Sequence, residues 1–198
     1  MARLVAMGSD KGRRQFIAGR WLARVAAACF TGTQPNDWVL VAASNGAPEI
    51  HLRSTGRVQG VHLSLSHSGE MIAAAIASFP LGIDLESTGK VRDWIALAEY
   101  VFAPEECEQL RLLPASDRQE LFYRYWTLKE ASGKRAGTGL RLLQARTQRA
   151  RECDEREAFA ITWQSNGLCL ALAGERGMRA IAHGIPVRMQ QRYWRFDT

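Results

Sequence analysis

The sequence has few cysteines and no long apolar run, and both features exclude classes of protein. Its cysteines lie at positions 29, 107, 153 and 169, too far apart for a Cys-x-x-Cys zinc motif. A chain of 198 residues can form a core without disulfides, so we expect four reduced thiols. The longest apolar runs, such as 71–77, fall far short of the roughly 20 residues of a membrane-spanning helix. Because the first residues also lack a secretory signal, we expect a cytoplasmic protein with no membrane partner.

Composition excludes disorder and points to a negatively charged ligand or partner. Hydrophobic residues make up 46% of the chain and charged residues 23%, as in an ordinary folded protein. The sequence shows no internal repeat and no low-complexity block. Lysine and arginine outnumber aspartate and glutamate by 26 to 20, which gives a formal net charge of +6. This modest excess favours an acidic partner or a phosphate-bearing ligand.

The order of the expected helices and strands predicts an α+β fold. Apolar residues recur at helical spacing over 11–30, 92–102 and 116–131. A capping-box pattern, Ser116-Asp117-Arg118-Gln119, is expected to open the last of these helices, and Pro104 can begin a further one. Strands are expected over 38–43, 61–66, 71–78, 81–86, 158–164, 168–173 and 178–185. Strands, then helices, then strands are typical of an α+β domain, and we expect a subdomain junction near Pro80.

The segment Leu81-Gly82-Ile83-Asp84-Leu85-Glu86 predicts two carboxylates on one face of a strand. Residues two apart in a strand share a face, so Asp84 and Glu86 project side by side while the larger apolar residues can enter the core. Adjacent carboxylates repel each other unless a cation lies between them, and hard oxygen ligands suit Mg²⁺. The simpler interpretation is a solvated acidic face, which the spacing alone favours.

A second candidate segment is the predicted helix around Trp126-Thr127-Leu128-Lys129-Glu130 and on to Lys134. Trp126, Glu130 and Lys134 are spaced i, i+4 and i+8, so they lie on one side of a helix. Glu130 could supply a third oxygen to a metal ion, and Lys134 could hold a phosphate as a mobile point charge. A surface Glu–Lys pair beside a packed tryptophan explains the same spacing.

A third candidate segment is Leu63-Ser64-Leu65-Ser66-His67-Ser68-Gly69. We expect His67 just past the end of a strand, at a turn, among small hydroxyl-bearing residues. A histidine there could donate to a phosphate or to a ribose hydroxyl, or it could simply bond the backbone of the turn.

Taken together and in this order, the three segments resemble the 4′-phosphopantetheinyl transferase superfamily, surfactin-synthetase-activating type. The shared motifs are Ser-x-Ser-His-Ser, Gly-Ile-Asp-Leu-Glu and Trp-x-x-Lys-Glu-x-x-x-Lys, with Phe102-Ala103-Pro104-Glu105-Glu106 between the last two. The resemblance spans roughly 13–139. It implies a monomeric pseudo-dimer of two similar α+β subdomains with the active site in the cleft between them. Residues 1–80 would form the coenzyme A-binding side, and residues 81–198 would carry the metal ligands and the Trp-x-x-Lys-Glu helix.

The same resemblance implies an activity and a set of site residues. Such enzymes use Mg²⁺ to transfer the phosphopantetheine arm of coenzyme A to a serine of an apo acyl, peptidyl or aryl carrier protein, and they release 3′,5′-ADP. The implied Mg²⁺ ligands are Asp84, Glu86 and Glu130, and the implied catalytic residues are Glu130, Lys134 and Asp84. The implied coenzyme A contacts are Ser66, His67, Lys129, Lys134 and, toward the 3′-phosphate, Arg13, Arg14 and Arg20. Glu106 is expected near the site.

One departure from the family pattern concerns adenine. Members often have Gly-Lys-Pro before the Ser-His motif, whereas this chain has Gly46-Ala47-Pro48. Ala47 cannot supply a charge, so the resemblance predicts one contact fewer there, with recognition left to the backbone.

Two other functions stay open from the residues alone. A Mg²⁺-dependent nuclease or another phosphoryl-transfer enzyme would also use an acidic strand and a helical glutamate. A basic nucleic-acid-binding protein would use the interleaved bases and aromatics near the C-terminus: Arg188, Arg192, Tyr193, Trp194 and Arg195. We interpret that tail as a final strand of the sheet and expect no nucleic-acid partner. A family member that binds without transferring is disfavoured because Asp84, Glu86, Glu130 and Lys134 are intact.

Overall fold

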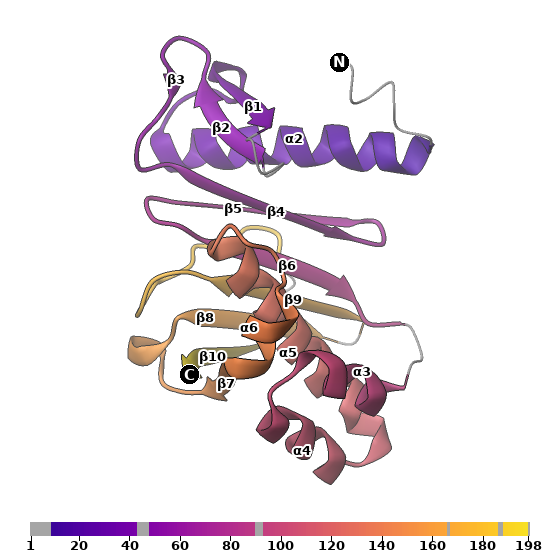
Figure 1. Ribbon diagram of the computed structural model, residues 1–198. Helices are drawn as coiled ribbons and strands as arrows, with labels where there is room; N and C mark the ends of the chain where they lie inside the picture. Colours follow the sequence, from indigo (N-terminus) through magenta and orange to yellow (C-terminus); the bar gives the residue numbers. More distant parts are fainter. Residues whose placement is uncertain (1–8, 43–47, 90–92, 166, 186–187, 198) are drawn as a thin grey trace.

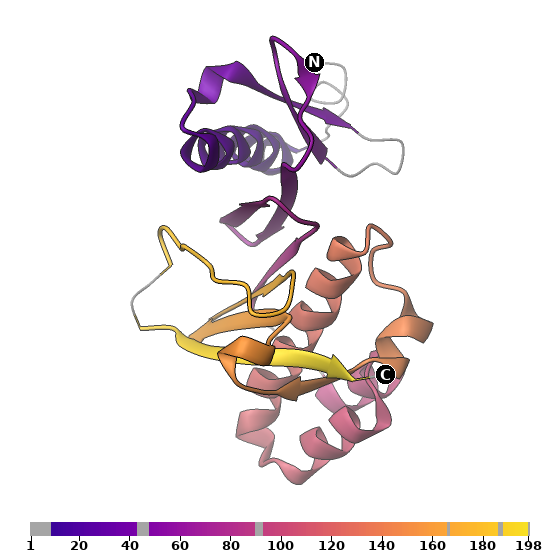
Figure 2. The same cartoon turned by 90° about the vertical axis from the view of Figure 1, so that its left-hand side faces the viewer.

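The computed structural model describes residues 9–42, 48–89, 93–165, 167–185 and 188–197. The hairpin formed by β4 (His62–Ser68) and β5 (Met71–Ala77) lies between the other N-terminal elements and the C-terminal half (Figures 1 and 2). No helix among the described residues is long and apolar enough to cross a membrane.

One long helix on antiparallel strands makes up the N-terminal half. Helix α2 (Asp10–Thr31) begins after Ser9, whose hydroxyl accepts the amide of Gly12 at 3.1 Å, and it ends at Gly32, which adopts a left-handed conformation with φ of 71°. The strands are β1 (Trp38–Ala42), β2 (Pro48–Leu52), β3 (Gly56–Arg57), β4 (His62–Ser68) and β5 (Met71–Ala77). Strands β1, β2 and β3 form one sheet, and β4 and β5 form a hairpin. Alanines of α2 and apolar residues of β1 and β2 form the core of this half.

The C-terminal half is a five-stranded antiparallel sheet with a long helix on one face. The sheet order is β6-β9-β8-β10-β7. Its strands are β6 (Gly82–Ser87), β7 (Arg149–Glu152), β8 (Ala160–Ser165), β9 (Leu168–Ala173) and β10 (Gln190–Asp197). Helix α5 (Ala115–Arg135) packs Phe122, Tyr125 and Leu128 against small residues of the sheet, among them Ala160 and Ala171. Beside it lie α3 (Trp94–Val101), α4 (Pro104–Leu112) and α6 (Leu142–Thr147). The α+β class predicted from the sequence is therefore confirmed.

Most expected elements are present, and two expectations are wrong. Residues 178–185 form no strand in the described part of the chain, because the place next to β8 is taken by β10. Helix α5 begins at Ala115 after Pro114, so Ser116 does not cap it, and the Ser116 hydroxyl donates instead to Asp117. The strands β2, β3 and β7 and the helix α6 were not expected. The turn predicted over residues 45–48 and the helix start predicted at Arg92 lie wholly or partly outside the described residues.

Candidate active site

The acidic strand β6 lies directly against helix α5, and Gly82 makes this approach possible. A Cβ atom added at Gly82 would lie 1.9 Å from the carbonyl oxygen of Ala131 and 2.5 Å from the amide nitrogen of Arg135, so only glycine fits. Leu81, Ile83 and Leu85 are buried, as the strand pattern predicted. The face that carries Gly82, Asp84 and Glu86 therefore points toward α5, and it is not a solvated face, because Asp84 is only 5% exposed.

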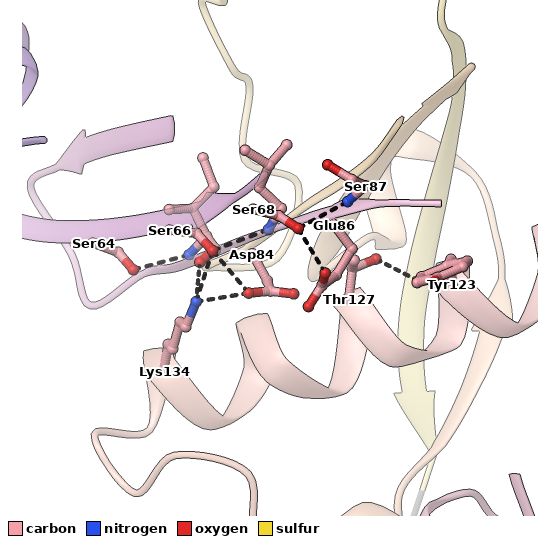
Figure 3. A network of polar contacts seen from close by, with 11 residues as sticks. Ser64, Ser66, Ser68, Asp84, Glu86, Ser87, Tyr123, Thr127 and Lys134 are labelled. Atoms are coloured by element: carbon pink, nitrogen blue, oxygen red, sulfur yellow. Dashed lines mark hydrogen bonds and ion pairs between the residues drawn. The ribbon is translucent and has the colours of Figure 1, made fainter. Parts of the chain in front are cut away.

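Lys134 connects the two elements. Its ammonium donates to Oδ1 of Asp84 at 2.7 Å, to the hydroxyl of Ser66 at 3.1 Å and to the carbonyl of Ile83 at 3.1 Å (Figure 3). Among the described residues Lys134 thus forms its ion pair across to β6, and not along its own helix with Glu130. Sequence reasoning placed Lys134 and Asp84 in one site, and the structure joins them directly.

At this contact between strand and helix, the carboxylates of Asp84 and Glu86 lie close enough to Glu130 to affect its charge. Burial raises the pKa of Glu130, and the neighbouring Asp84 and, to a smaller extent, Glu86 raise it further, while Lys134 opposes the shift. Oδ2 of Asp84 is buried and has no hydrogen-bond partner among the described residues. The site therefore combines mutually repelling carboxylates with one unsatisfied buried oxygen, which is a setting that a divalent cation would stabilise. Within the described ranges, no three acidic, histidine or cysteine side chains are already gathered in an arrangement that could hold a metal.

Lys129 does not reach this cluster. Its ammonium lies 2.9 Å from Oε2 of Glu106, and it donates to the carbonyls of Ala145 (2.8 Å) and Gln148. Both charged side chains are 1% exposed, and Glu106 also accepts the backbone amides of Ala103 and Ala150. Burial lowers the pKa of Lys129, and Glu106 opposes this shift. The structure therefore does not support the expected coenzyme A contact of Lys129 or the expected place of Glu106 near the site. Instead, the Lys129–Glu106 pair ties α4 and α5 to the α6–β7 segment.

The arginines of α2 and His67 also lie outside the cluster. Arg13 pairs with Asp10 at 3.0 Å, and Arg20 donates to the carbonyl of Leu40 at 2.7 Å. Arg14 is exposed. The pKa of Glu70 is lowered mainly by Lys11, and Arg14 adds a smaller contribution in the same direction. His67 is exposed and lies within β4, where it pairs with Ile72, so the turn position expected for it is wrong. In a strand it takes the face opposite to Ser66 and Ser68.

A basic pocket of about 470 Å³ opens beside the cluster and shares Lys134 with it. Arg135 follows Lys134 at the end of α5, and Arg57 and His51 face the pocket from the N-terminal strands. Glu49 also lines the pocket, 3.0 Å from His51 and 3.8 Å from Arg57. Pro80 and Leu81 complete the wall at the junction between the two halves. Three cationic side chains and two histidines, His51 and His62, around one cavity suit a ligand that carries several phosphates.

Sequence reasoning missed most of this pocket and also missed Ser68. Arg57, His51 and Arg135 belong to no recognisable motif, so no sequence signal marked them. Ser68 did carry a signal, because Ser64, Ser66 and Ser68 alternate along one strand face.

The chain is similar to known 4′-phosphopantetheinyl transferases. Residues 80–175, which include β6 and α5, match the sequence profile of the 4′-phosphopantetheinyl transferase superfamily. The chain is 36% identical over 133 residues to the 4′-phosphopantetheinyl transferase HetI of Nostoc sp., a match that covers 67% of this chain and 55% of HetI. It is 31% identical over 150 residues to a 4′-phosphopantetheinyl transferase of Bacillus subtilis, with 72% and 64% covered. Residues 80–175 of this chain therefore contain a domain of the 4′-phosphopantetheinyl transferase superfamily.

Two further matches are shorter or more distant. The transferase Sfp of Bacillus subtilis is 33% identical over 81 residues, which cover 41% of this chain and 35% of Sfp. A holo-(acyl-carrier-protein) synthase of Bacillus anthracis, solved in complex with CoA (3′,5′-ADP), matches 50% of this chain and 97% of its own with a TM-score of 0.42 and 18% identity. A TM-score of this size supports no detailed comparison. The chain covers less than two thirds of the length of HetI and of the first Bacillus subtilis relative.

Proposed function

We propose that this protein is a 4′-phosphopantetheinyl transferase, which moves the phosphopantetheine arm of coenzyme A to a serine of an apo acyl, peptidyl or aryl carrier protein. The observation that carries the proposal is the cluster of Asp84, Glu86 and Glu130 joined through Lys134 to a basic pocket, in a chain that contains a domain of this superfamily. We further propose that residues 1–80 and 81–198 are its two subdomains, because the pocket lies where they meet.

Coenzyme A is the proposed donor because its charge matches the pocket. A pyrophosphate next to Lys134 and a further phosphate near Arg57 or Arg135 would each have a cationic partner. In this assignment Arg57, Arg135 and His51 take the phosphate-binding role that the family resemblance implied for the α2 arginines. Arg20 is already bonded to Leu40, and Arg13 to Asp10.

The acidic cluster fits Mg²⁺ in its chemistry. Oδ2 of Asp84 and the carboxylates of Glu86 and Glu130 would hold the ion. When bound, Mg²⁺ would offset the negative charge that builds on the pyrophosphate.

The protein's own residues supply the remaining steps. The carrier serine oxygen forms a bond to the phosphorus that bears pantetheine, and the bond from that phosphorus to the bridging oxygen of 3′,5′-ADP breaks. Lys134 lies where its ammonium can stabilise the negative charge on the departing 5′-phosphate of 3′,5′-ADP. We assign Glu130 as the base for the serine proton, because burial and the neighbouring carboxylates raise its pKa in the metal-free protein.

The nucleic-acid alternative finds no favourable observation in the tail that suggested it. Trp194 is 3% exposed within β10, Arg192 pairs with Glu152 at 2.9 Å, and Arg195 pairs with Glu157 at 3.1 Å. These side chains hold the sheet edge together and do not form a row of free aromatic platforms.

Incubation with coenzyme A, Mg²⁺ and a panel of apo-carrier proteins tests the proposal. We expect each accepted carrier to gain the mass of one phosphopantetheine, and the Asp84→Asn variant to transfer none. Cleavage of DNA or RNA without any carrier modification would favour the nuclease instead. Carriers left unmodified by a folded protein that binds coenzyme A would contradict the proposed transferase.

A further inference from the structure

Strands β4 and β6 lie side by side, and hydrogen bonds from serine side chains join them. Their contacts run in the same direction along both strands, so the two strands are parallel. Three backbone amides of β6 donate to three serine hydroxyls of β4: Ile83 to Ser64 (3.0 Å), Leu85 to Ser66 (3.2 Å) and Ser87 to Ser68 (3.0 Å). The hydroxyls thus take the place that backbone carbonyls occupy in an ordinary sheet (Figure 3).

Two of these hydroxyls also donate to a carboxylate of β6. Ser66 donates to Oδ1 of Asp84 at 3.0 Å, and Ser68 donates to Oε2 of Glu86 at 2.9 Å. A serine hydroxyl carries one proton, and a hydroxyl that accepts an amide on one side can aim that proton at the carboxylate on the other. Ser64 accepts its amide in the same way, but the hydrogen bonds of the described residues give it no carboxylate.

We propose that Ser68 and Ser66 are positioning residues, which hold the carboxylates of Glu86 and Asp84 toward the cation of the site. This inference rests on the proposed function. The reason is a pattern that repeats along the two strands. Each serine holds the carboxylate of one β6 residue and accepts the amide of the next: Glu86 and Ser87 for Ser68, and Asp84 and Leu85 for Ser66. One hydroxyl therefore sets both the register of β6 and the direction of its acid.

Glu86 depends on this bond more than Asp84 does. The Asp84 carboxylate is also held by Lys134, whereas Glu86 is a longer, half-buried side chain near the end of its strand. Glu130 and Asp84 repel it, so without the serine proton its carboxylate is expected to turn toward solvent. Partners of this kind typically change metal affinity by about 10- to 100-fold, and we expect about tenfold for Ser68.

The test uses the full-length protein and Mn²⁺ as the probe, with free Mn²⁺ measured by electron paramagnetic resonance in the presence of coenzyme A. The variants are Ser68→Ala, the conservative Ser68→Thr and the matched control Ser64→Ala. Ser64→Ala and Ser68→Ala each remove one acceptor from a β6 amide, so both should lower the urea midpoint of unfolding to a similar extent. Only Ser68→Ala should weaken Mn²⁺ binding, by about tenfold, and Ser68→Thr should restore it.

The outcomes separate this inference from the proposed function. Unchanged Mn²⁺ affinity in Ser68→Ala, or an equal loss in Ser64→Ala, would show that the serines only join the strands. Absence of Mn²⁺ binding by the wild-type protein would overturn the inference even if carriers are modified. Selective loss of Mn²⁺ binding in Ser68→Ala would support the positioning role even if no carrier is modified, in which case only the proposed transferase activity fails.

Discussion

Among the residues of the site that carry no functional side chain, Gly82 should be the most sensitive to substitution. In a Gly82→Ala variant the new methyl group would lie 1.9 Å from the carbonyl oxygen of Ala131 and 2.5 Å from the amide nitrogen of Arg135. Both atoms belong to the backbone of α5, so no side-chain rotation can relieve the contact. To reach 3.0 Å, below which real Cβ contacts are essentially never seen, β6 and α5 must separate by about 1.1 Å.

That displacement predicts both a stability loss and an activity loss. Overpacking of this kind typically costs about 1–3 kcal/mol, and we expect the upper end because the obstacle is backbone. The bond from Lys134 to Asp84 would lengthen from 2.7 Å to about 3.8 Å, which is beyond hydrogen-bond distance. A misplacement of about 1 Å at a reacting centre can cost about 100-fold in rate, so we expect kcat/KM for phosphopantetheine transfer to fall by that order.

The assay pairs urea unfolding with transfer kinetics, and it uses Gly89→Ala as the control. Gly89 follows the same strand, has nothing within 4 Å of an added Cβ and does not have a left-handed backbone. The control should therefore keep both its unfolding midpoint and its transfer rate. A Gly82→Ala protein with wild-type stability and turnover would refute the argument that the close contact of β6 and α5 builds the site.

Other predictions concern the charged residues and the carrier. Glu130→Gln should abolish transfer yet stabilise the metal-free protein at neutral pH. The folded state raises the pKa of Glu130 above its ordinary value of 4.5, so ionisation of this group costs stability as pH rises. Urea unfolding in chelator should therefore show a gain in stability of the variant over the wild type that grows as pH rises above about 4.5. Lys134→Ala should lower the free energy of unfolding by about 3 kcal/mol, because it leaves Asp84 buried without its cation, and adding Asp84→Asn should recover part of the stability but no transfer. Lys129→Met should lower the free energy of unfolding by about 3 kcal/mol, because it leaves Glu106 buried without its cation, while the KM for coenzyme A should stay near the wild-type value. A large rise in this KM would instead indicate that Lys129 contacts coenzyme A. The KM for apo-carrier, measured at saturating coenzyme A, should rise with salt, because exposed charges steer a basic protein to an acidic partner; a flat profile would indicate apolar docking.

Trp94 and Phe122 are not available as an apolar docking surface for the carrier. They are 9% and 3% exposed and pack against each other with ring centroids 5.0 Å apart. A helix pattern shows that such residues share an apolar face, and only the packed structure shows that the face is covered.

The sequence by itself determined which residues share a face, because the periods of strands and helices are local properties of the chain. It placed Asp84 and Glu86 together on β6, opposite to Leu81, Ile83 and Leu85, and the structure confirms that division. It also placed Glu130 and Lys134 on one side of α5, and its resemblance to a transferase family agrees with the comparisons.

Only the tertiary structure decided which element lies opposite each face. The spacing of Glu130 and Lys134 equally allowed an ion pair along their own helix, but Lys134 reaches Asp84 on a strand 50 positions earlier in the sequence. Lys129, its neighbour in the same motif, faces the other way and is neutralised by Glu106 in the core. The serine hydroxyls of β4 bond to β6 because the two strands lie side by side, and their spacing alone gave no sign of that partner. Local patterns set the direction of a side chain, whereas its charge state, burial and partner depend on contacts between distant segments, which exist only once the chain has folded.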